Sequence, residues 1–283
     1  MFLLARATGD PIELLLPAEA TVQDREFLIQ KLGLDKPLPE QYYLFMTRTL
    51  SGQFEDSIRY GRPAIELFLQ RFPNSLKLIA VAFIFGYGVA VPLGVIAGSR
   101  RGSFSDQVAR LIAVIGIATP GFWLGLMLIY IVGVGLGWLP VARMGGTTHY
   151  ILPAFTLAFR LLAGVARLLR SSMIEVLDSE FVKLARIKGV SRNMVLYRHA
   201  LRNAVIPALS LAGMQVALLL GGTVVIETVF AWPGSGRLVY EGIIYRDYPL
   251  VQTVVLLKGT FIIGTNFLID ILYSYVDPRI RYA

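Results

Sequence analysis

Six polar or charged side chains interrupt long apolar runs of the sequence, a setting where such groups are uncommon and usually functional. Arg160 lies near the middle of one run, and Asn266 and Asp270 fall one turn apart on the same face of a predicted helix. An unpaired charge at the centre of a bilayer costs at least ~2.5–3.5 kcal/mol, so each group must face protein or water. The full set is Arg160, Gln215, Glu227, Lys258, Asn266 and Asp270.

These six residues allow two interpretations. In the first, they line a wet path through the membrane, and Arg160 or Lys258 meets a carboxylate of the molecule that passes. In the second, the polar groups join packed helices, as Arg160 and Glu227 would if they formed an ion pair. Both interpretations require membrane-spanning helices that hold these side chains away from lipid.

Motifs that would give the chain an enzymatic activity of its own are absent from the sequence. There is no G-x-x-x-x-G-K-[S/T] phosphate-binding loop, and neither H-E-x-x-H nor G-x-S-x-G occurs. The absence of cysteine excludes disulfides, Cys-ligated zinc and iron–sulfur clusters, and His149 and His199 are too few for a His-rich metal site. We therefore expect no catalytic residue, metal or cofactor in this chain, and its energy must come from another subunit.

The composition identifies the elements that must position these groups. Of the 283 residues, 55% are hydrophobic, and the apolar runs are long enough to cross a hydrocarbon core of ~30 Å. The net charge of +8 lies mostly in short segments between these runs, which is typical of topology-setting charge rather than of nucleic-acid binding. We therefore predict an all-α, polytopic transmembrane helical bundle. Its five spans are expected at about 75–98, 108–136, 150–169, 204–230 and 250–276.

The basic loops predict how this bundle is oriented. Loop 99–107, loop 170–203 and the tail 277–283 carry an excess of Lys and Arg, which favours the cytoplasmic side. The polar segment 8–74, expected to form short helices and loops, is then extracytoplasmic. Residues 1–7 are predicted to be the remnant of a first transmembrane helix.

Loop 170–203, called the basic loop below, contains two predicted short helices that are separated at Gly189. Asp178 or Ser179 can cap the first helix and Ser191 the second, and glycine suits the left-handed residue just after a helix end. Such an element could dock into a groove of a partner protein or lie on anionic lipid. The second helix is predicted to place Val190, Met194, Tyr197 and Leu201 on an apolar face. Its other side would carry Arg192, Arg198, His199 and Arg202.

Motifs along the whole chain then point to one family. The basic loop reads Ala185-Arg186-Ile187-Lys188-Gly189, then Arg198-His199-Ala200-Leu201-Arg202-Asn203-Ala204 and Pro207. Further motifs are Gly9-Asp10-Pro11, Pro120-Gly121-Phe122-Trp123, Ala166-Arg167-Leu168 with Arg170-Ser171-Ser172-Met173, Glu227-Thr228-Val229-Phe230 with Trp232-Pro233-Gly234, Arg246-Asp247-Tyr248-Pro249, and Asp277-Pro278-Arg279-Ile280-Arg281-Tyr282. Together they resemble the EAA loop and other motifs of ABC-transporter permeases of the dipeptide, oligopeptide and nickel family.

The resemblance implies a first-type permease subunit that forms half of a translocation path in the cytoplasmic membrane of a bacterium or archaeon. Its implied partners are a second homologous permease, two cytoplasmic ABC ATPases that bind ATP and Mg, an extracytoplasmic solute-binding protein and membrane lipid. The helix from Glu180 to Lys188 would couple ATP hydrolysis to transport. The expected coupling residues are Glu180, Lys183, Ala185, Arg186, Lys188, Gly189, Arg198, His199 and Arg202.

Three questions stay open at the level of sequence. The family usually has six spans, the first ending just before the motif at Gly9, so most of that helix is expected to be missing through a late start, a truncation or a genuine five-helix form. The substrate is open among dipeptides, oligopeptides, nickel, glutathione and sugars. The alternative class is an ion-gradient-driven secondary transporter or channel, which would predict inverted internal repeats that this sequence does not show.

Overall fold

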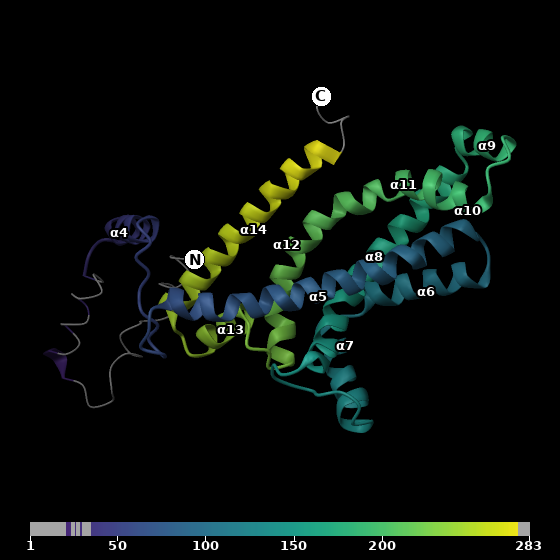
Figure 1. The fold of residues 1–283 in the computed structure, drawn as a ribbon. Helices are drawn as coiled ribbons and strands as arrows, with labels where there is room; N and C mark the ends of the chain where they lie inside the picture. The colour runs from purple at the N-terminus through teal and green to yellow at the C-terminus, as the bar shows by residue number, and fades with distance from the viewer. Residues whose placement is uncertain (1–20, 24–25, 27–28, 30–34, 277–283) are drawn as a thin grey trace. The chain divides into compact units, whose positions relative to one another are not determined.

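The computed structural model describes residues 21–23, 26, 29 and 35–276, except for the side chains of Asp270 and of 272–276. Within those residues every regular element is helical, and the β-structure is limited to an isolated bridge between Asp56 and Pro63. This confirms the all-α prediction (Figure 1). The predictions for residues 1–7 and for the tail 277–283 lie outside the described part of the chain.

The chain divides into two compact units. The first contains residues 1–73 and 234–260, and the second contains residues 74–233 and 261–283. The helices α5 (Ala64–Ser99) and α14 (Tyr248–Val276) contribute residues to both.

Four helical segments among the described residues are long and apolar enough to cross a membrane. They are Ala64–Ser99, Thr147–Leu177, Ile206–Val229 and Tyr248–Ile269, and a bent pair from Phe104 to Gly135 makes five if it counts as one span. In the element order these are α5, the 3₁₀ turn η2 (Thr147–Tyr150) with α8 (Ile151–Leu177), α12 (Ile206–Val229) and α14. The bent pair consists of α6 (Phe104–Ala118), α7 (Gly121–Leu128) and the π-helix η1 (Ile129–Gly135).

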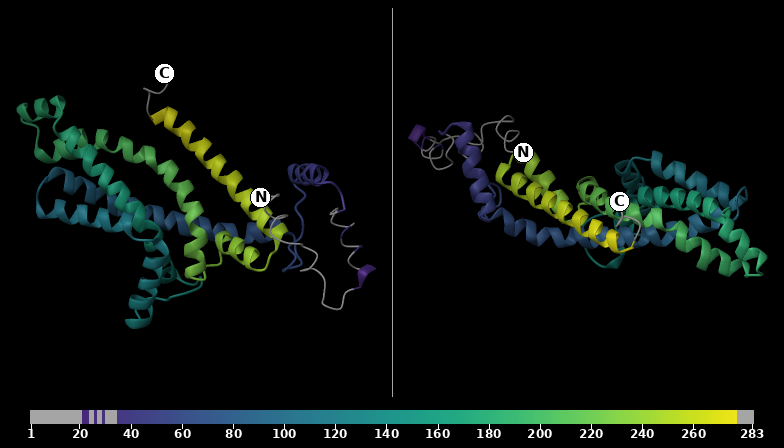
Figure 2. Two further views of the ribbon diagram at one scale, coloured as in Figure 1. Left: turned by 180° about the vertical axis from the view of Figure 1, so that it is seen from behind. Right: turned by 90° about the horizontal axis from the view of Figure 1, so that it is seen from above.

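The predicted second span, 108–136, is therefore not a straight helix. α6 and the helix that follows it are bent by 105° at Thr119 and Pro120. Thr119 has extended backbone angles, φ −79° and ψ 122°, as expected for a residue before proline, and Pro120 cannot donate the backbone hydrogen bond that would continue the helix. Thus the proline redirects the chain (Figure 2).

Two spans are embedded in helices longer than their apolar runs. α5 begins at Ala64 rather than near residue 75, so the polar segment 8–74 does not end at a helix boundary. α8 continues to Leu177 rather than stopping near residue 169, so Arg170 lies on a helix and not in a loop. Bilayer thickness limits the length of an apolar run, whereas the helix itself can continue into water.

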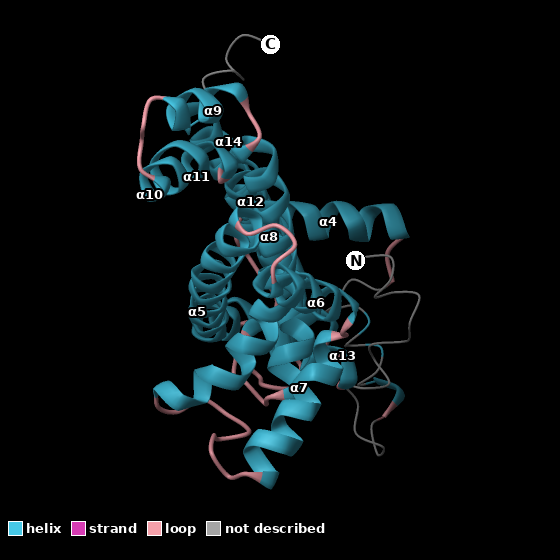
Figure 3. Ribbon diagram, turned by 90° about the vertical axis from the view of Figure 1, so that its right-hand side faces the viewer, coloured by secondary structure: helices cyan, strands magenta, loops and turns pink. Residues whose placement is uncertain are grey.

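Glycines on α5 let that helix approach α8 closely in the second unit. A Cβ atom at Gly94 would lie 2.9 Å from the Cβ of Leu169, and one at Gly98 would lie 2.6 Å from the Cβ of Met173. This Gly-x-x-x-Gly spacing is the usual device for close packing of membrane helices. α6 also packs against α8 (Figure 3).

The first unit is organised around the buried carboxylate of Asp247. It accepts hydrogen bonds from the backbone amides of Arg59 at 3.1 Å and of Leu250 at 3.2 Å, and from the hydroxyl of Ser57. Asp247 therefore caps the start of α14 and fixes the loop around Ser57. The unit also contains α4 (Leu38–Leu50) and α13 (Ser235–Ile244).

Candidate functional site

The first helix of the basic loop, α9 (Glu180–Ile187), carries apolar side chains on its exposed side. Val182 is fully buried and fixes the helix to the rest of the second unit. Phe181, Leu184 and Ile187 are 45%, 56% and 81% exposed. Their i, i+3, i+6 spacing places them along one stripe of the helix. We call Phe181, Leu184 and Ile187 the α9 stripe.

Gly189 ends α9 in the way that the sequence predicts. Its φ of +77° is left-handed, its amide donates to the carbonyl of Arg186 at 3.0 Å, and the amide of Val190 donates to the carbonyl of Ala185 at 3.1 Å. These two bonds form a Schellman motif, which satisfies carbonyls at the helix end. The geometry requires glycine because a Cβ atom is strained at this φ.

The predicted side-chain caps of these helices are not formed. Ser179 and Ser191 occupy the N-cap positions with extended backbone, but neither makes a capping side-chain hydrogen bond. The Ser179 hydroxyl instead donates to the carbonyl of Val176 at 2.5 Å. Asp178 is the C-cap residue of α8, which ends at Leu177.

The second half of the loop corrects the predicted amphipathic face. It consists of α10 (Arg192–Met194), the π-helix η3 (Val195–Ala200) and α11 (Leu201–Ala204). The buried residues are Val195, Ala200 and Ala204. Of these, Ala200 and Ala204 join Val95 of α5 and Leu169 and Met173 of α8 in one cluster. Met194 and Tyr197 are exposed instead. The π-turn explains the difference, since an i→i+5 repeat brings Val195 and Ala200 onto one face where a 3.6-residue repeat would not.

The expected coupling residues gather in this loop region and are mostly solvent-facing. Glu180 and Lys183 form an exposed ion pair at 2.8 Å, and this contact raises the pKa of Lys183. Arg186 donates to the carbonyl of Leu177 at 3.4 Å. His199 and Ala185 are half-buried, whereas the exposed members are Glu180, Lys183, Arg186, Lys188, Gly189, Arg198 and Arg202.

A buried ion pair that sequence reasoning missed braces the helices beside this loop. Asp106 of α6 is buried, and both of its carboxylate oxygens accept hydrogen bonds from the Arg170 guanidinium of α8, one of them at 3.0 Å. The Gly102 amide also donates to it at 2.9 Å. The sequence analysis placed Arg170 in the basic loop and in a family motif, and assigned it no partner. The sequence features that could have indicated this ion pair are an acidic residue in loop 99–107 and a basic residue at the end of an apolar run.

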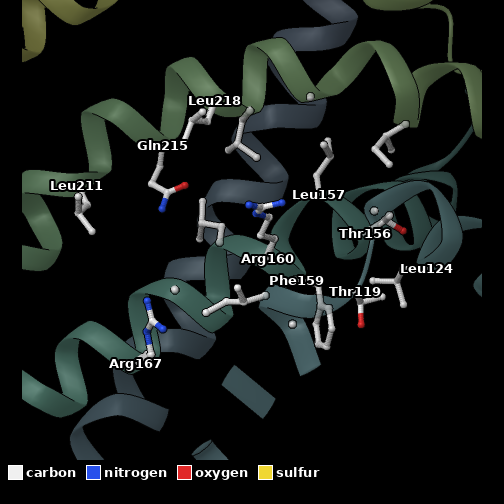
Figure 4. Close-up of a pocket in the computed structure, with 18 of the residues that line it drawn as sticks. Thr119, Leu124, Thr156, Leu157, Phe159, Arg160, Arg167, Leu211, Gln215 and Leu218 are labelled. Atoms are coloured by element: carbon white, nitrogen blue, oxygen red, sulfur yellow. The ribbon is translucent and has the colours of Figure 1, made fainter. Parts of the chain in front are cut away.

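Two of the six polar intramembrane residues meet at a cavity of about 970 Å³ inside the second unit. Arg160 comes from α8 and Gln215 from α12, and Figure 4 shows the Arg160 guanidinium directed into the cavity. Arg167 of α8 lines the same cavity, although the sequence analysis had not assigned it to a path. The bent α6–α7 segment supplies a further wall through Thr119 and Phe122.

Glu227 and Asn266, which belong to the second unit, do not line this cavity. Glu227 is fully buried, and no ion pair joins it to Arg160, although both residues lie in the described part of the chain. Lys258 belongs to the first unit, and its side chain is buried. Asn266 is half-buried, and the side chain of Asp270 lies outside the described residues. The Arg160–Glu227 ion pair, given above as one example of the second interpretation, is not formed between these two described residues.

Comparisons with known sequences agree with this helical architecture. Residues 90–282 match the family described as binding-protein-dependent transport system inner membrane component. The chain is 37% identical to the oligopeptide transport system permease protein AppB of Bacillus subtilis, an alignment that covers 99% of this chain and 92% of that protein. It is 40% identical to the glutathione transport system permease protein GsiC of Salmonella choleraesuis, covering 97% and 90%. The chain therefore belongs to the family of binding-protein-dependent transport system inner-membrane components.

Solved structures show the same fold. A chain of the MetNI methionine ABC transporter in an inward-facing conformation aligns with a TM-score of 0.64 and 19% identity, covering 75% of this chain and 97% of that chain. A chain of an amino acid ABC transporter aligns with a TM-score of 0.60 and 18% identity, covering 75% and 94%. At these identities the likeness supports the fold of an ABC-transporter transmembrane subunit.

Proposed function

We propose that this chain is the permease subunit of an ATP-driven importer for peptides or similar small solutes, coupled to its ATPases through α9. The observation that carries the coupling is the α9 stripe. Exposed apolar side chains at i, i+3 and i+6 on a short helix are suited to a groove of a partner protein. Val182 is buried and anchors α9 in the second unit, and the Schellman turn at Gly189 fixes the end of the helix, so a displacement of α9 would be passed to the helices that it packs against.

The partners are proposed from the family and from the chain's own residues. Two ATPases would contact α9 in the cytosol and bind the ATP and Mg that this chain has no motif to hold. A second permease would complete the path, and an extracytoplasmic binding protein would deliver the solute. The basic loops 99–107 and 170–203 favour this orientation.

The proposed domain organisation follows from these assignments. Residues 8–74 form the extracytoplasmic segment, residues 75–276 form the transmembrane domain, and residues 170–203 form the coupling loop. The bent pair α6–α7 and the helices α8 and α12 surround the cavity that would be part of the path. A peptide-like solute is proposed because two of the similar proteins are named for oligopeptide and for glutathione transport.

Uptake into proteoliposomes tests this function. The complete complex, with the second permease, both ATPases and the binding protein, is assayed with labelled oligopeptide or glutathione. Uptake that requires ATP and the binding protein is expected, and a proton gradient alone should give none. Uptake driven by the gradient without ATP would favour a secondary transporter and overturn the proposal.

A further inference from the structure

Two arginines supply the charge of the α8–α12 cavity. The residues that line it are otherwise apolar side chains, glycines and uncharged polar groups, and all of them are described in the structure. No acidic side chain lines the wall with Arg160 and Arg167, and neither guanidinium forms an ion pair or hydrogen bond within the described part of the chain. The cavity therefore has a positive potential that its own residues do not neutralise.

The two arginines are spaced along one face of one helix. A separation of i, i+7 on α8 returns to the same face after two turns, and it places the two Cα atoms ~10 Å apart along the axis. Gly164 lies between them, and a Cβ atom there would meet nothing within 4 Å. An open strip therefore connects the two guanidinium groups. Figure 4 shows Arg160 and Arg167 on successive parts of this helix, with Gln215 and Leu218 on the facing α12.

The free-energy cost of holding the Arg160 charge inside a span indicates that the cavity binds an anionic group. Arg160 lies near the middle of an apolar span, where an uncompensated charge costs at least ~2.5–3.5 kcal/mol on insertion scales. Water in the cavity can solvate a guanidinium, but a planar fork of donors is also suited to two oxygens of a carboxylate. The side-chain amide of Gln215 can donate a further hydrogen bond from the opposite wall.

We propose that Arg160 and Arg167 are two successive binding positions for a carboxylate of the transported solute. This inference rests on the proposed function, because it makes the cavity part of the path. Arg167 lies nearer to loop 170–203, so a carboxylate that moves from Arg160 to Arg167 advances towards the proposed cytoplasmic side. The chain would then favour solutes with a free carboxylate, independently of the selection made by a binding protein.

Chemical footprinting of the full chain in nanodiscs tests the site directly. Phenylglyoxal modifies accessible guanidinium groups, and mass spectrometry measures the rate at each arginine. Triglycine should slow labelling of Arg160 and Arg167, whereas triglycine amide, which lacks the carboxylate, should not. Arg192, which is exposed outside the cavity, serves as the internal control. Equal protection by both compounds, or protection by neither, would overturn the proposal.

Transport by the complete complex provides the second measurement. Arg160→Gln should lower ATP-driven uptake of triglycine about tenfold, the value expected for one lost charge-assisted hydrogen bond. It should leave uptake of triglycine amide unchanged, and Arg160→Lys should restore part of the loss. Gly164→Leu, which fills the strip without changing charge, should also reduce triglycine uptake. Equal loss of both compounds in Arg160→Gln would show that Arg160 does not act on the carboxylate of the solute, and would contradict the proposal.

The two proposals fail in different ways. If the wild-type complex takes up triglycine without ATP while footprint protection persists, the importer assignment fails and the carboxylate site stands. If ATP-driven uptake is normal in Arg160→Gln and no protection is found, the site fails and the importer assignment stands.

Discussion

At the residue scale, the turn after α9 depends on one backbone conformation. A left-handed L-residue costs roughly 1–2 kcal/mol, so Gly189→Ala should destabilise the Schellman turn by about that amount. Hydrogen exchange at the amide of Val190, which bonds to Ala185 across the turn, should accelerate about tenfold. Gly221→Ala is the control, because a Cβ there meets nothing and its φ is ordinary. An unchanged exchange rate of the Val190 amide in Gly189→Ala would contradict the Schellman turn at Gly189.

The ion pair between Asp106 and Arg170 makes a separate prediction. Asp106→Asn leaves the guanidinium without its carboxylate, which costs about 3–5 kcal/mol when both partners are buried. Because the Arg170 side chain keeps 21% of its exposure, we expect Asp106→Asn to lower the free energy of unfolding by about 2–3 kcal/mol. The loss is measured as a lower Tm of the chain in detergent. Glu180→Gln, which removes an exposed ion pair, should leave the Tm nearly unchanged because water already screens the two charges. Similar losses in both variants would show that Asp106 does not brace the helices.

At the element scale, the α9 stripe should be needed for coupling and not for folding. Leu184→Asp places a charge on an exposed position, so the chain should insert and keep its Tm, while ATP-dependent uptake should fall at least about tenfold if the side chain is a buried contact in the complex. Leu50→Asp, at an exposed position of α4, is the matched control and should transport normally. Normal uptake by Leu184→Asp would contradict the role of the stripe.

The approach of α5 to α8 is the second prediction for an element. Gly94→Val inserts a side chain where a Cβ atom already lies 2.9 Å from Leu169, and such overpacking typically costs about 1–3 kcal/mol. Gly88→Val on the same helix has nothing within 4 Å and should be nearly neutral. Thermal unfolding of the two variants in the same detergent measures the difference. A Tm for Gly94→Val equal to that of Gly88→Val would show that the helices can separate at no cost.

The elements also show what could and could not be predicted from sequence. Apolar runs predict that spans exist because burial in lipid requires them, and Gly189 predicts a helix end because few residues adopt its φ. The exposed face of the second loop helix was mispredicted because η3 is a π-helix, and no local pattern announces that change of repeat. The partner of Arg170 was missed because Asp106 is distant in sequence, and only tertiary packing brings the two together.

At the scale of the whole molecule, family membership and helical fold identify a transport-system membrane component, and the exposed α9 stripe is consistent with the proposed coupling to cytosolic ATPases. The cavity at Arg160 was only partly foreseen, since the sequence marks polar residues in spans but not which of them share a wall. Arg160 and Gln215 meet there, and Glu227 does not. The helix repeat alone cannot make that distinction, because it depends on how α8 and α12 rotate against each other.

Thiol-directed crosslinking tests most directly the central claim that α9 contacts an ATPase subunit in the cytosol. Because the chain contains no cysteine, Leu184→Cys introduces a single reactive thiol on the α9 stripe. In membranes that contain the complete complex, a bifunctional thiol reagent should join this position to an ATPase subunit, with a yield that changes when ATP is added. Labelling of the same thiol by a membrane-impermeant maleimide from outside intact cells, or crosslinks to lipid alone during active uptake, would contradict the account.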